Sequence, residues 1–241
     1  MGPDVEWPRE QTARKTMQGE ETVLTKDEVT AIYRKRAKRY DFTANLFRVI
    51  GFREPAYREM AVKALNLQRG DTVVEIGCGT GLNFPLLQEA VGPAGKIIGV
   101  DLTDAMLAEA HSRVEKQGWT NVELVQSDAA QYRFPSGVDG IISSFAITLV
   151  PEFDQIIRNG AEALSPGKRW VILDFQLPTK QPARLLTPLA VWLTRPFGVR
   201  IEMANRHPWE SIDKYFTNSS LTEYYMGMAY ISVGKRGETT G

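Results

Sequence analysis

The sequence predicts an α/β fold with a doubly wound, mostly parallel seven-stranded sheet that ends in an antiparallel hairpin. Three observations carry this prediction. Short β-branched runs alternate with helical stretches, which is typical of parallel sheets built from βαβ units. A glycine-rich turn follows the first of these runs. The tail holds two further β-rich runs around a single glycine, which predicts a hairpin.

The elements follow in order along the chain. Strands are predicted at Thr72–Ile76, Lys96–Val100, Val122–Val125, Val138–Ser143 and Trp170–Leu173. Helices are predicted from the glycine turn to about Ala90, and over Asp104–Lys116, Phe153–Leu164 and Pro208–Phe216. The hairpin strands are predicted at Leu221–Tyr225 and Met228–Val233. Right-handed crossovers would bring the carboxyl ends of the parallel strands to one edge of the sheet.

The chain is expected to divide into four segments. Residues 1–24 are polar and aperiodic, which predicts a flexible leader, and residues 237–241 predict a flexible tail. Residues 25–66 predict N-terminal helices, the second of them over Pro55–Leu65. Residues 67–236 hold the alternating pattern and predict the ligand-binding domain.

Bulk composition narrows the class of protein. The 29 basic and 29 acidic residues cancel, so no nucleic-acid partner is expected. Cys78 is the only cysteine, which excludes an intrachain disulfide and fits a reducing compartment. No signal peptide and no run of ~20 apolar residues is present, so a cytoplasmic location is expected, with peripheral membrane contact left open. No residue cluster has the spacing of metal ligands, so no metal is expected.

The ends of the first three strands carry the candidate ligand site. The turn Gly77–Gly81 reads GCGTG, and its glycines permit positive φ and close backbone approach to a ligand. Asn83 and the next helix's amides can serve the polar end of that ligand. Asp101 ends the second strand and can accept both ribose hydroxyls, and Asp128 after the third can accept from adenine. Each acid alone could instead be a helix cap or a solvated loop residue.

Two kinds of ligand fit a glycine turn of this type. A dinucleotide fingerprint requires glycine at position 82, where this sequence has Leu82. The second acid, Asp128, suits a nucleoside that carries a short amino-acid arm and no pyrophosphate. The pattern therefore favours the nucleoside.

The stretch Val73–Leu87 closely resembles motif I of class I methyltransferases that use S-adenosylmethionine (SAM). The resemblance covers roughly residues 30–235 and is strong again over Asp101–Leu107 and Asn121–Ala130. It looks most like the ubiquinone/menaquinone biosynthesis C-methyltransferases and the bacterial phosphatidylethanolamine N-methyltransferases. The resemblance implies a Rossmann-like fold, SAM as cofactor and S-adenosylhomocysteine as product.

The resemblance also implies roles for individual residues. The glycines should line the methionine arm of SAM, Asp101 should hold the ribose, and Ser144 and Phe145 should lie near the sulfonium. The tyrosines of the N-terminal helix should cover the cofactor. The full set of expected cofactor residues is Tyr33, Tyr40, Glu75, Gly77, Cys78, Gly79, Thr80, Gly81, Asn83, Asp101, Leu102, Met106, Asp128, Ala129, Ser144 and Phe145.

The expected acceptor is a small amphiphilic or lipid-linked molecule such as a phospholipid amine. Thr80–Pro85 and Leu149–Pro151 resemble the lipid enzymes, whereas Val91–Lys96 and the terminal hairpin resemble the quinone enzymes. Quinone-type enzymes usually carry an Arg-Asn pair after the fourth strand, and this chain does not. The alternatives are a quinone-precursor C-methyltransferase or another small-molecule N-, S- or O-methyltransferase. A nucleic-acid or protein methyltransferase and a non-catalytic SAM-binding module are weaker hypotheses.

Three weaker signals concern the acceptor. Arg34, Lys35, Lys38 and Arg39 share one face of the N-terminal helix, which indicates either a solvated face or contact with anionic lipid. The apolar stripe Leu185–Leu193 would pack on the core or wall the acceptor entrance. His207 is the one candidate for a general base. The alternative is that its side chain only makes local hydrogen bonds. The sequence does not identify any other catalytic residue.

Overall fold

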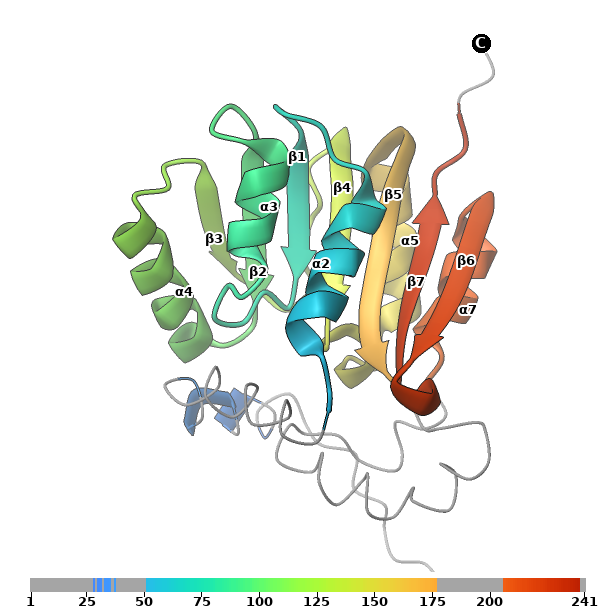
Figure 1. Cartoon of the computed structure of the whole chain (residues 1–241), viewed down its shortest axis with the longest axis horizontal. Coiled ribbons are helices and arrows are strands. Elements are labelled where there is room, and N and C mark those ends of the chain that lie inside the picture. Colours follow the sequence, from blue (N-terminus) through green and yellow to red (C-terminus); the bar gives the residue numbers. More distant parts are fainter. Residues whose placement is uncertain are drawn as a thin grey trace, which may run out of the picture.

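The computed structural model describes residues 28, 30, 31, 33–35, 37, 51–176 and 206–238. In these residues the chain forms a seven-stranded sheet with helices on both faces, which confirms the predicted fold class (Figure 1). The expected leader, Tyr40, Lys38, Arg39 and the stripe Leu185–Leu193 lie outside the described residues. The expected segment boundaries stay predictions.

The strands and helices lie close to their predicted positions. The strands are β1 (Thr72–Ile76), β2 (Lys96–Asp101), β3 (Val122–Gln126), β4 (Val138–Ser144), β5 (Leu164–Phe175), β6 (Asn218–Tyr224) and β7 (Ala229–Lys235). The helices are α2 (Glu54–Leu65), α3 (Phe84–Val91), α4 (Asp104–Gln117), α5 (Phe153–Ala163) and α7 (Pro208–Tyr215), with single 3-10 turns η2 (Ile147–Leu149) and η6 (Tyr225–Gly227). Strand β5 begins at Leu164, well before the predicted Trp170. Its first residue pairs with Val138 of β4, and the register then shifts, so that the next pair is Arg169 with Gly140.

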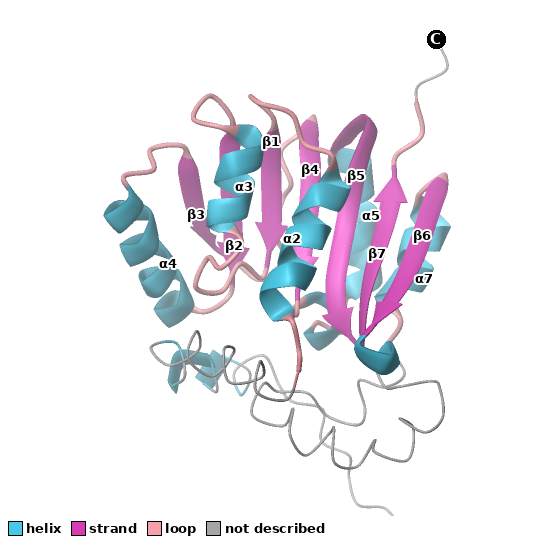
Figure 2. Cartoon of the chain, in the orientation of Figure 1, coloured by secondary structure: helices cyan, strands magenta, loops and turns pink. Residues whose placement is uncertain are grey.

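The sheet order is β3-β2-β1-β4-β5-β7-β6. The first five strands pair in parallel, and β7 runs antiparallel between β5 and β6 (Figure 2). The predicted hairpin is therefore present, but its second strand inserts next to β5. Strand β1 has β2 on one side and β4 on the other, so the strand order reverses at β1. Open α/β sheets bind ligands at the carboxyl ends of the strands at such a reversal.

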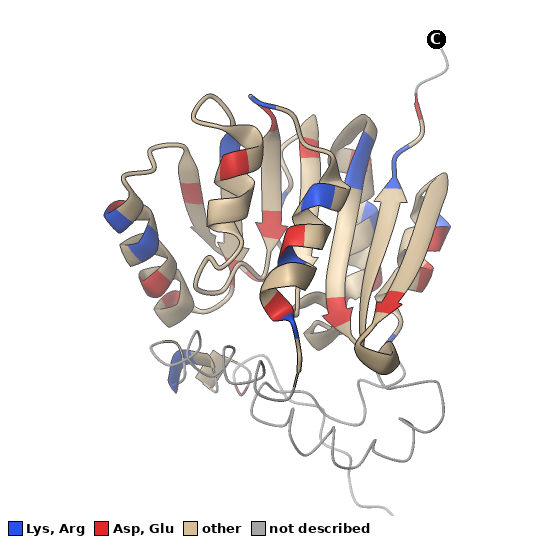
Figure 3. Ribbon diagram, in the orientation of Figure 1, with Lys and Arg blue, Asp and Glu red and all other residues tan. Residues whose placement is uncertain are grey.

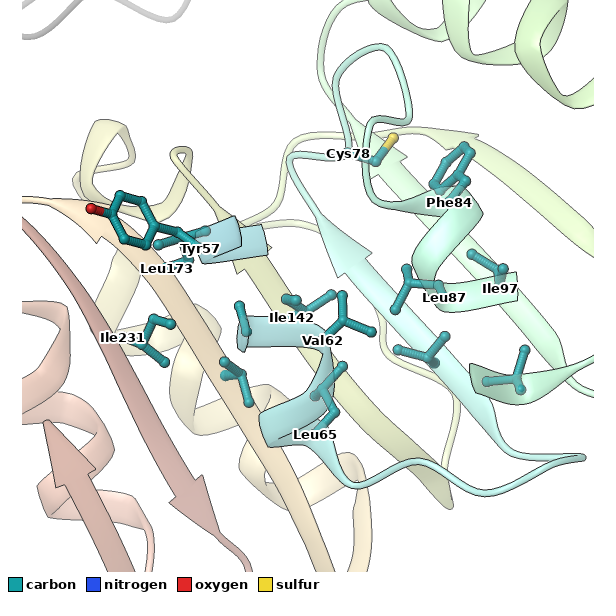
Figure 4. Close-up of a cluster of buried hydrophobic side chains, with 14 of the residues drawn as sticks. Tyr57, Val62, Leu65, Cys78, Phe84, Leu87, Ile97, Ile142, Leu173 and Ile231 are labelled. Atoms are coloured by element: carbon teal, nitrogen blue, oxygen red, sulfur yellow. The ribbon is translucent and has the colours of Figure 1, made fainter. Parts of the chain in front are cut away.

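Alternate residues of each central strand enter two separate cores. Val73 of β1 and Val171 of β5 belong to one cluster with residues of α2, α3 and α4. Their neighbours Val74 and Ile172 belong to the other cluster, with residues of α5 and α7. This alternation follows from the two-residue period of a strand, and it leaves both faces of the sheet apolar. Figure 4 shows the first cluster extending as far as the glycine turn.

A glycine in α5 allows the second core to close. Gly160 packs against the ring of Trp170, which is fully buried, and a methyl group at Gly160 would overlap that ring. We expect Gly160→Ala to lower the free energy of unfolding by about 1–3 kcal/mol through overpacking. Denaturant titration measures the change, with Arg158→Ala on the exposed face of the same helix as control. A Gly160→Ala protein as stable as that control would show that the helix shifts without cost.

Candidate functional site

A pocket opens at the carboxyl ends of β1, β2, β3 and β4, at the reversal of strand order. Most of the expected cofactor residues line it. Those residues are Tyr33, Gly77, Gly79, Asp101, Leu102, Met106, Asp128, Ala129, Ser144 and Phe145. Parallel strands place all these positions together because their carboxyl ends share one edge of the sheet (the lower edge in Figure 1).

The glycine turn forms the floor of this pocket. The amides of Gly77 and Cys78 donate to the carbonyl of Val100 at 2.8 and 3.0 Å, which ties the turn to the end of β2. Gly77, Gly79 and Gly81 have φ of 69°, 54° and 76°, a region that favours glycine. A side chain at Gly77 would collide with Ala146, whereas nothing lies within 4 Å of the Cβ position of Gly79. The turn is thus packed on one side and open toward the pocket on the other, as a closely approached ligand requires.

Asp101 links the turn to the end of β2. Its Oδ2 accepts from the amide of Gly79 at 2.8 Å and its Oδ1 accepts from the amide of Thr103 at 2.8 Å. Burial raises the pKa of Asp101, and these amide hydrogen bonds oppose that rise. Each carboxylate oxygen can accept a second hydrogen bond, so the pair retains capacity for two vicinal hydroxyls. The carboxylate therefore also shapes the turn, a role that the sequence did not reveal.

The third strand end carries Asp128. Its Oδ1 accepts from the amide of Ala130 at 3.0 Å, which fixes the carboxylate in a short turn. The amide of Ser127 donates to the carbonyl of Asp101 at 3.0 Å, which joins the ends of β2 and β3. Met106, on the first turn of α4, is buried beside them in the pocket lining. This side of the pocket thus offers one carboxylate between apolar walls.

Five of the expected cofactor residues are not in the pocket lining: Glu75, Cys78, Thr80, Gly81 and Asn83. The thiol of Cys78 is buried next to Phe84 (Figure 4), and burial raises its pKa, so it contributes packing and a backbone amide. Burial also raises the pKa of Glu75 to about 8, although Arg58 and Asn83 lower it. Glu75 Oε2 is buried without a hydrogen-bond partner in the described residues.

An apolar wall faces the glycine turn across the pocket. It consists of Ala146, Leu149, Val150 and Pro151, which follow β4. Asp174 near the end of β5 holds this wall, since its Oδ2 accepts from Thr148 N at 3.0 Å and Thr148 Oγ1 at 2.9 Å. Arg206 Nη1 donates to the carbonyls of Thr148 and Leu149 at 2.8 and 3.0 Å. Contacts from two distant segments therefore set the position of the wall.

Aromatic rings cluster where the wall meets β4. The rings of Phe145 and Phe175 lie 4.6 Å apart between centroids, and Phe52 lies 6.0 and 5.4 Å from them. Tyr225 lies 5.3 Å from Phe52. Phe145 has a positive φ of 56°, which is costly for a bulky residue and places its ring in the pocket lining. Such strain is common at ligand sites.

The N-terminal helix reaches the pocket through Tyr33, which is among its lining residues. Arg34 Nε lies 2.9 Å from Asp104 Oδ1 on the first turn of α4. Both of these side chains are about half exposed, so this ion pair contributes at most about 1 kcal/mol. The described residues of this helix thus contact the pocket lining at Tyr33 and the first turn of α4 at Arg34.

His207 has local contacts outside the pocket. Its Nδ1 lies 3.1 Å from Glu210 Oε1, and its ring stacks on Trp209 at 4.6 Å. It is not among the residues that line the pocket. These contacts are of the local kind, and a role of His207 as a base stays a prediction.

Sequence reasoning missed several residues of the pocket. They are Ile76, Val100, Thr103, Ser127, Ala146, Leu149, Val150 and Pro151. The first four are neighbours of predicted residues at strand ends, so counting one further residue at each end would have found them. The resemblance had singled out Leu149–Pro151, but not their place in the pocket, because that place depends on Asp174 and Arg206 far along the chain.

Charge is distributed over the described helices without a dominant sign. Figure 3 shows basic and acidic residues interspersed on helices of both layers. No helix in the described residues is both long and apolar enough to cross a membrane.

Comparison with known proteins agrees with this geometry. Residues 21–196 match the model of the ubiE/COQ5 methyltransferase family. A demethylmenaquinone methyltransferase of Geobacillus kaustophilus is 30% identical over 221 residues, which span 89% of this chain and 93% of that protein. The enzyme of the same name from Anoxybacillus flavithermus is also 30% identical, over 89% of this chain and 92% of its own. A SAM-dependent methyltransferase structure from Aquifex aeolicus has a TM-score of 0.55 at 23% identity, covering 74% of this chain and 88% of that one.

Proposed function

The chain belongs to the ubiE/COQ5 methyltransferase family and is a SAM-dependent methyltransferase, and from this premise we propose that it methylates a ring carbon of a quinone precursor in its reduced, quinol form. The observation that carries the proposal is the match to demethylmenaquinone methyltransferases along 89% of the chain. An apolar wall and an aromatic cluster beside the expected position of the methyl group give independent support.

The pocket residues fit SAM as cofactor. The open side of the glycine turn at Gly79 suits a closely approached methionine arm, and Asp101 retains acceptor capacity for the ribose hydroxyls. Asp128, which lines the pocket between apolar side chains, would face the adenine. Bound SAM would supply a methyl group on a positively charged sulfur. Glu75 and Asn83 would then support the turn, to which Cys78 belongs.

The acceptor would lie between the apolar wall and the ring of Phe145. A flat, apolar ring system is complementary to Leu149, Val150 and Pro151, which offer no side-chain hydrogen-bonding groups. The rings of Phe145 and Phe175 can contact an aromatic acceptor in tilted geometry. This wall replaces the water that would otherwise surround the reacting atoms, and it holds the acceptor in line with the methyl group.

The relatives support the quinone alternative rather than the phospholipid amine that the sequence alone favoured. That expectation was based partly on Leu149–Pro151, which the structure places in the pocket wall, where an apolar residue suits either acceptor. It was also based on the missing Arg-Asn pair after the fourth strand. In a quinol enzyme this departure would change how the acceptor hydroxyls are held, not which ring is methylated.

The protein's main contribution to this reaction would be to position the acceptor relative to the methyl group and the sulfur. A quinol hydroxyl donates electron density to the ring, so a ring carbon would form the new C–C bond as the bond between the methyl group and sulfur breaks and its electron pair stays on the sulfur of S-adenosylhomocysteine. The same ring carbon would then lose its proton to solvent, which restores the aromatic quinol. An amine acceptor would instead have to reach the site in its neutral form. Contact of the basic N-terminal helix with a membrane surface remains a proposal, and the Arg34–Asp104 pair uses one of its four predicted cations.

The oxidation state of the acceptor separates this proposal from other small-molecule methylations. We expect turnover with demethylmenaquinol kept reduced by dithionite, and no turnover with the oxidised quinone, because the quinone ring is electron-poor. Formation of S-adenosylhomocysteine and mass spectrometry of the extracted quinone measure both. Turnover that does not depend on reduction would contradict methylation at a quinol ring carbon.

A further inference from the structure

Arg58 is a buried cation for which the sequence gave no role. It lies on α2, is 7% exposed, and its Nε donates to Glu54 Oε1 at 2.7 Å. Its Nη1 donates to Asn83 Oδ1 at 3.1 Å. A buried guanidinium is costly unless its charge and its donors are satisfied. Glu54 balances the charge, so the hydrogen bond to Asn83 is an additional contact that reaches the glycine turn.

This contact sets the orientation of the Asn83 side chain. A guanidinium only donates hydrogen bonds, so it must face the amide oxygen of Asn83. The amide nitrogen then points the other way, where it donates to Glu75 Oε1 at 2.7 Å and to Ser144 Oγ at 2.9 Å. If the amide were flipped, its nitrogen would face the guanidinium of Arg58, and two donors would oppose each other. Arg58 thus selects the one orientation of Asn83 that connects β1 with the end of β4.

Arg58 makes a second contact with the pocket lining. Its Cζ lies 5.2 Å from the centroid of the Phe145 ring, within the range of a cation–π interaction. Ser144 and Phe145 are consecutive pocket residues, and the backbone of Phe145 has a positive φ. Both routes from Arg58 therefore end at the glycine-turn side of the pocket. Asp128 follows β3, and its carboxylate is fixed by the amide of Ala130, which belongs to neither route.

We propose that Arg58 is a positioning residue for the methionine-arm end of the cofactor site. It orients Asn83, and through Asn83 it holds Glu75 and Ser144, while its guanidinium supports the ring of Phe145. The proposal rests on the cofactor placement given under Proposed function, and it does not depend on which acceptor is used. Glu54 has the lesser role of balancing the charge.

Two ligands that differ only in the arm test this proposal. S-adenosylhomocysteine contains the nucleoside and the amino-acid arm, whereas methylthioadenosine lacks the arm. In the variant Glu54→Met/Arg58→Met both buried charges are removed together, which avoids leaving one unpaired. We expect S-adenosylhomocysteine to bind about tenfold or more weakly than to the wild type, because its arm end is misplaced. Methylthioadenosine should lose less than about threefold.

The same helix offers a matched control. Glu59 and Lys63 form an ion pair at the same spacing on the exposed face of α2, at 2.6 Å. Glu59→Met/Lys63→Met should leave the affinities of both ligands unchanged. Arg58→Lys is the second test variant, because it keeps a cation beside Glu54 but loses the planar guanidinium that reaches Asn83. We expect the same selective loss of affinity for S-adenosylhomocysteine. This variant tests the proposal even if the double variant fails to fold.

Calorimetric titration of both ligands, with thermal unfolding as a check of folding, decides the outcome. Equal losses for the two ligands, or no loss for either, in a folded Arg58 variant would overturn the proposal and leave Arg58 a purely structural residue. A wild-type protein that binds methylthioadenosine as tightly as S-adenosylhomocysteine would instead refute the cofactor placement itself. The two failures are therefore distinguishable.

Discussion

Replacing Asp101 with alanine is expected to weaken SAM binding by about 1.5–3 kcal/mol, or roughly 10- to 150-fold. The carboxylate lies at the end of β2 with both oxygens in the pocket region, and each oxygen can accept one hydroxyl beyond its amide. Removing it also releases the amides of Gly79 and Thr103, so the glycine turn loses support at the same time. Calorimetry with S-adenosylhomocysteine measures the loss.

A cycle with a modified ligand separates these two effects. An analogue of S-adenosylhomocysteine that lacks the ribose hydroxyls should bind the wild type weakly, and Asp101→Ala should weaken it further only by the part that the loosened turn causes. The loss caused by a loosened turn would instead appear equally with both ligands. If a folded Asp101→Ala protein still distinguishes the two ligands as well as the wild type does, the ribose is held by another group.

The pH dependence gives a further check on Asp101. Burial raises its pKa, so lowering the pH through that raised value should protonate the carboxylate and weaken binding of S-adenosylhomocysteine. Asp101→Asn should bind weakly at every pH and should lack this dependence. An identical pH profile in the wild type and Asp101→Asn would assign the titration to a different group.

Gly77→Ala is expected to have the second large effect, a loss of cofactor affinity of about tenfold or more. The backbone at Gly77 has φ of 69°, and a methyl group there would collide with the side chain of Ala146. Either the turn or the segment after β4 must move, and both belong to the pocket. Binding of S-adenosylhomocysteine measures the effect, with thermal unfolding as a check that the sheet remains intact.

The neighbouring residue supplies a matched rescue. Ala146→Gly in the Gly77→Ala protein removes the colliding methyl group but leaves the backbone strain of about 1–2 kcal/mol. We therefore expect the double variant to recover part of the lost affinity. No recovery at all would show that backbone strain alone accounts for the loss.

The strands of the sheet could be predicted from the sequence because each central strand is a short run of apolar, mostly β-branched residues. Val73, Val74 and Ile76 form a β-branched run buried on both faces, and the same holds for β2 and β4. The glycine turn and Asp101 were recognisable for a similar reason, since each comes directly after such a run. The insertion of β7 next to β5 was not recognisable, because a hairpin can dock by either strand.

The supports of the pocket could not be predicted from local patterns. Arg58 precedes Asn83 by 25 positions, and Asp174 follows Thr148 by 26. In sequence Arg58 resembles any basic residue of an amphipathic helix, and only the packing of α2 against the sheet buries it. The acceptor was ambiguous for the related reason that an apolar wall suits a lipid tail and a quinol ring alike.

The proposed reaction is tested most directly by letting the two candidate acceptors compete. Vesicles that contain both reduced demethylmenaquinone and phosphatidylethanolamine would be incubated with the full chain and SAM labelled in its methyl group. The account predicts that the label appears on a ring carbon of the quinol, as mass spectrometry and carbon NMR of the extracted product show. Label on the phospholipid nitrogen, or none on the quinol, would contradict it.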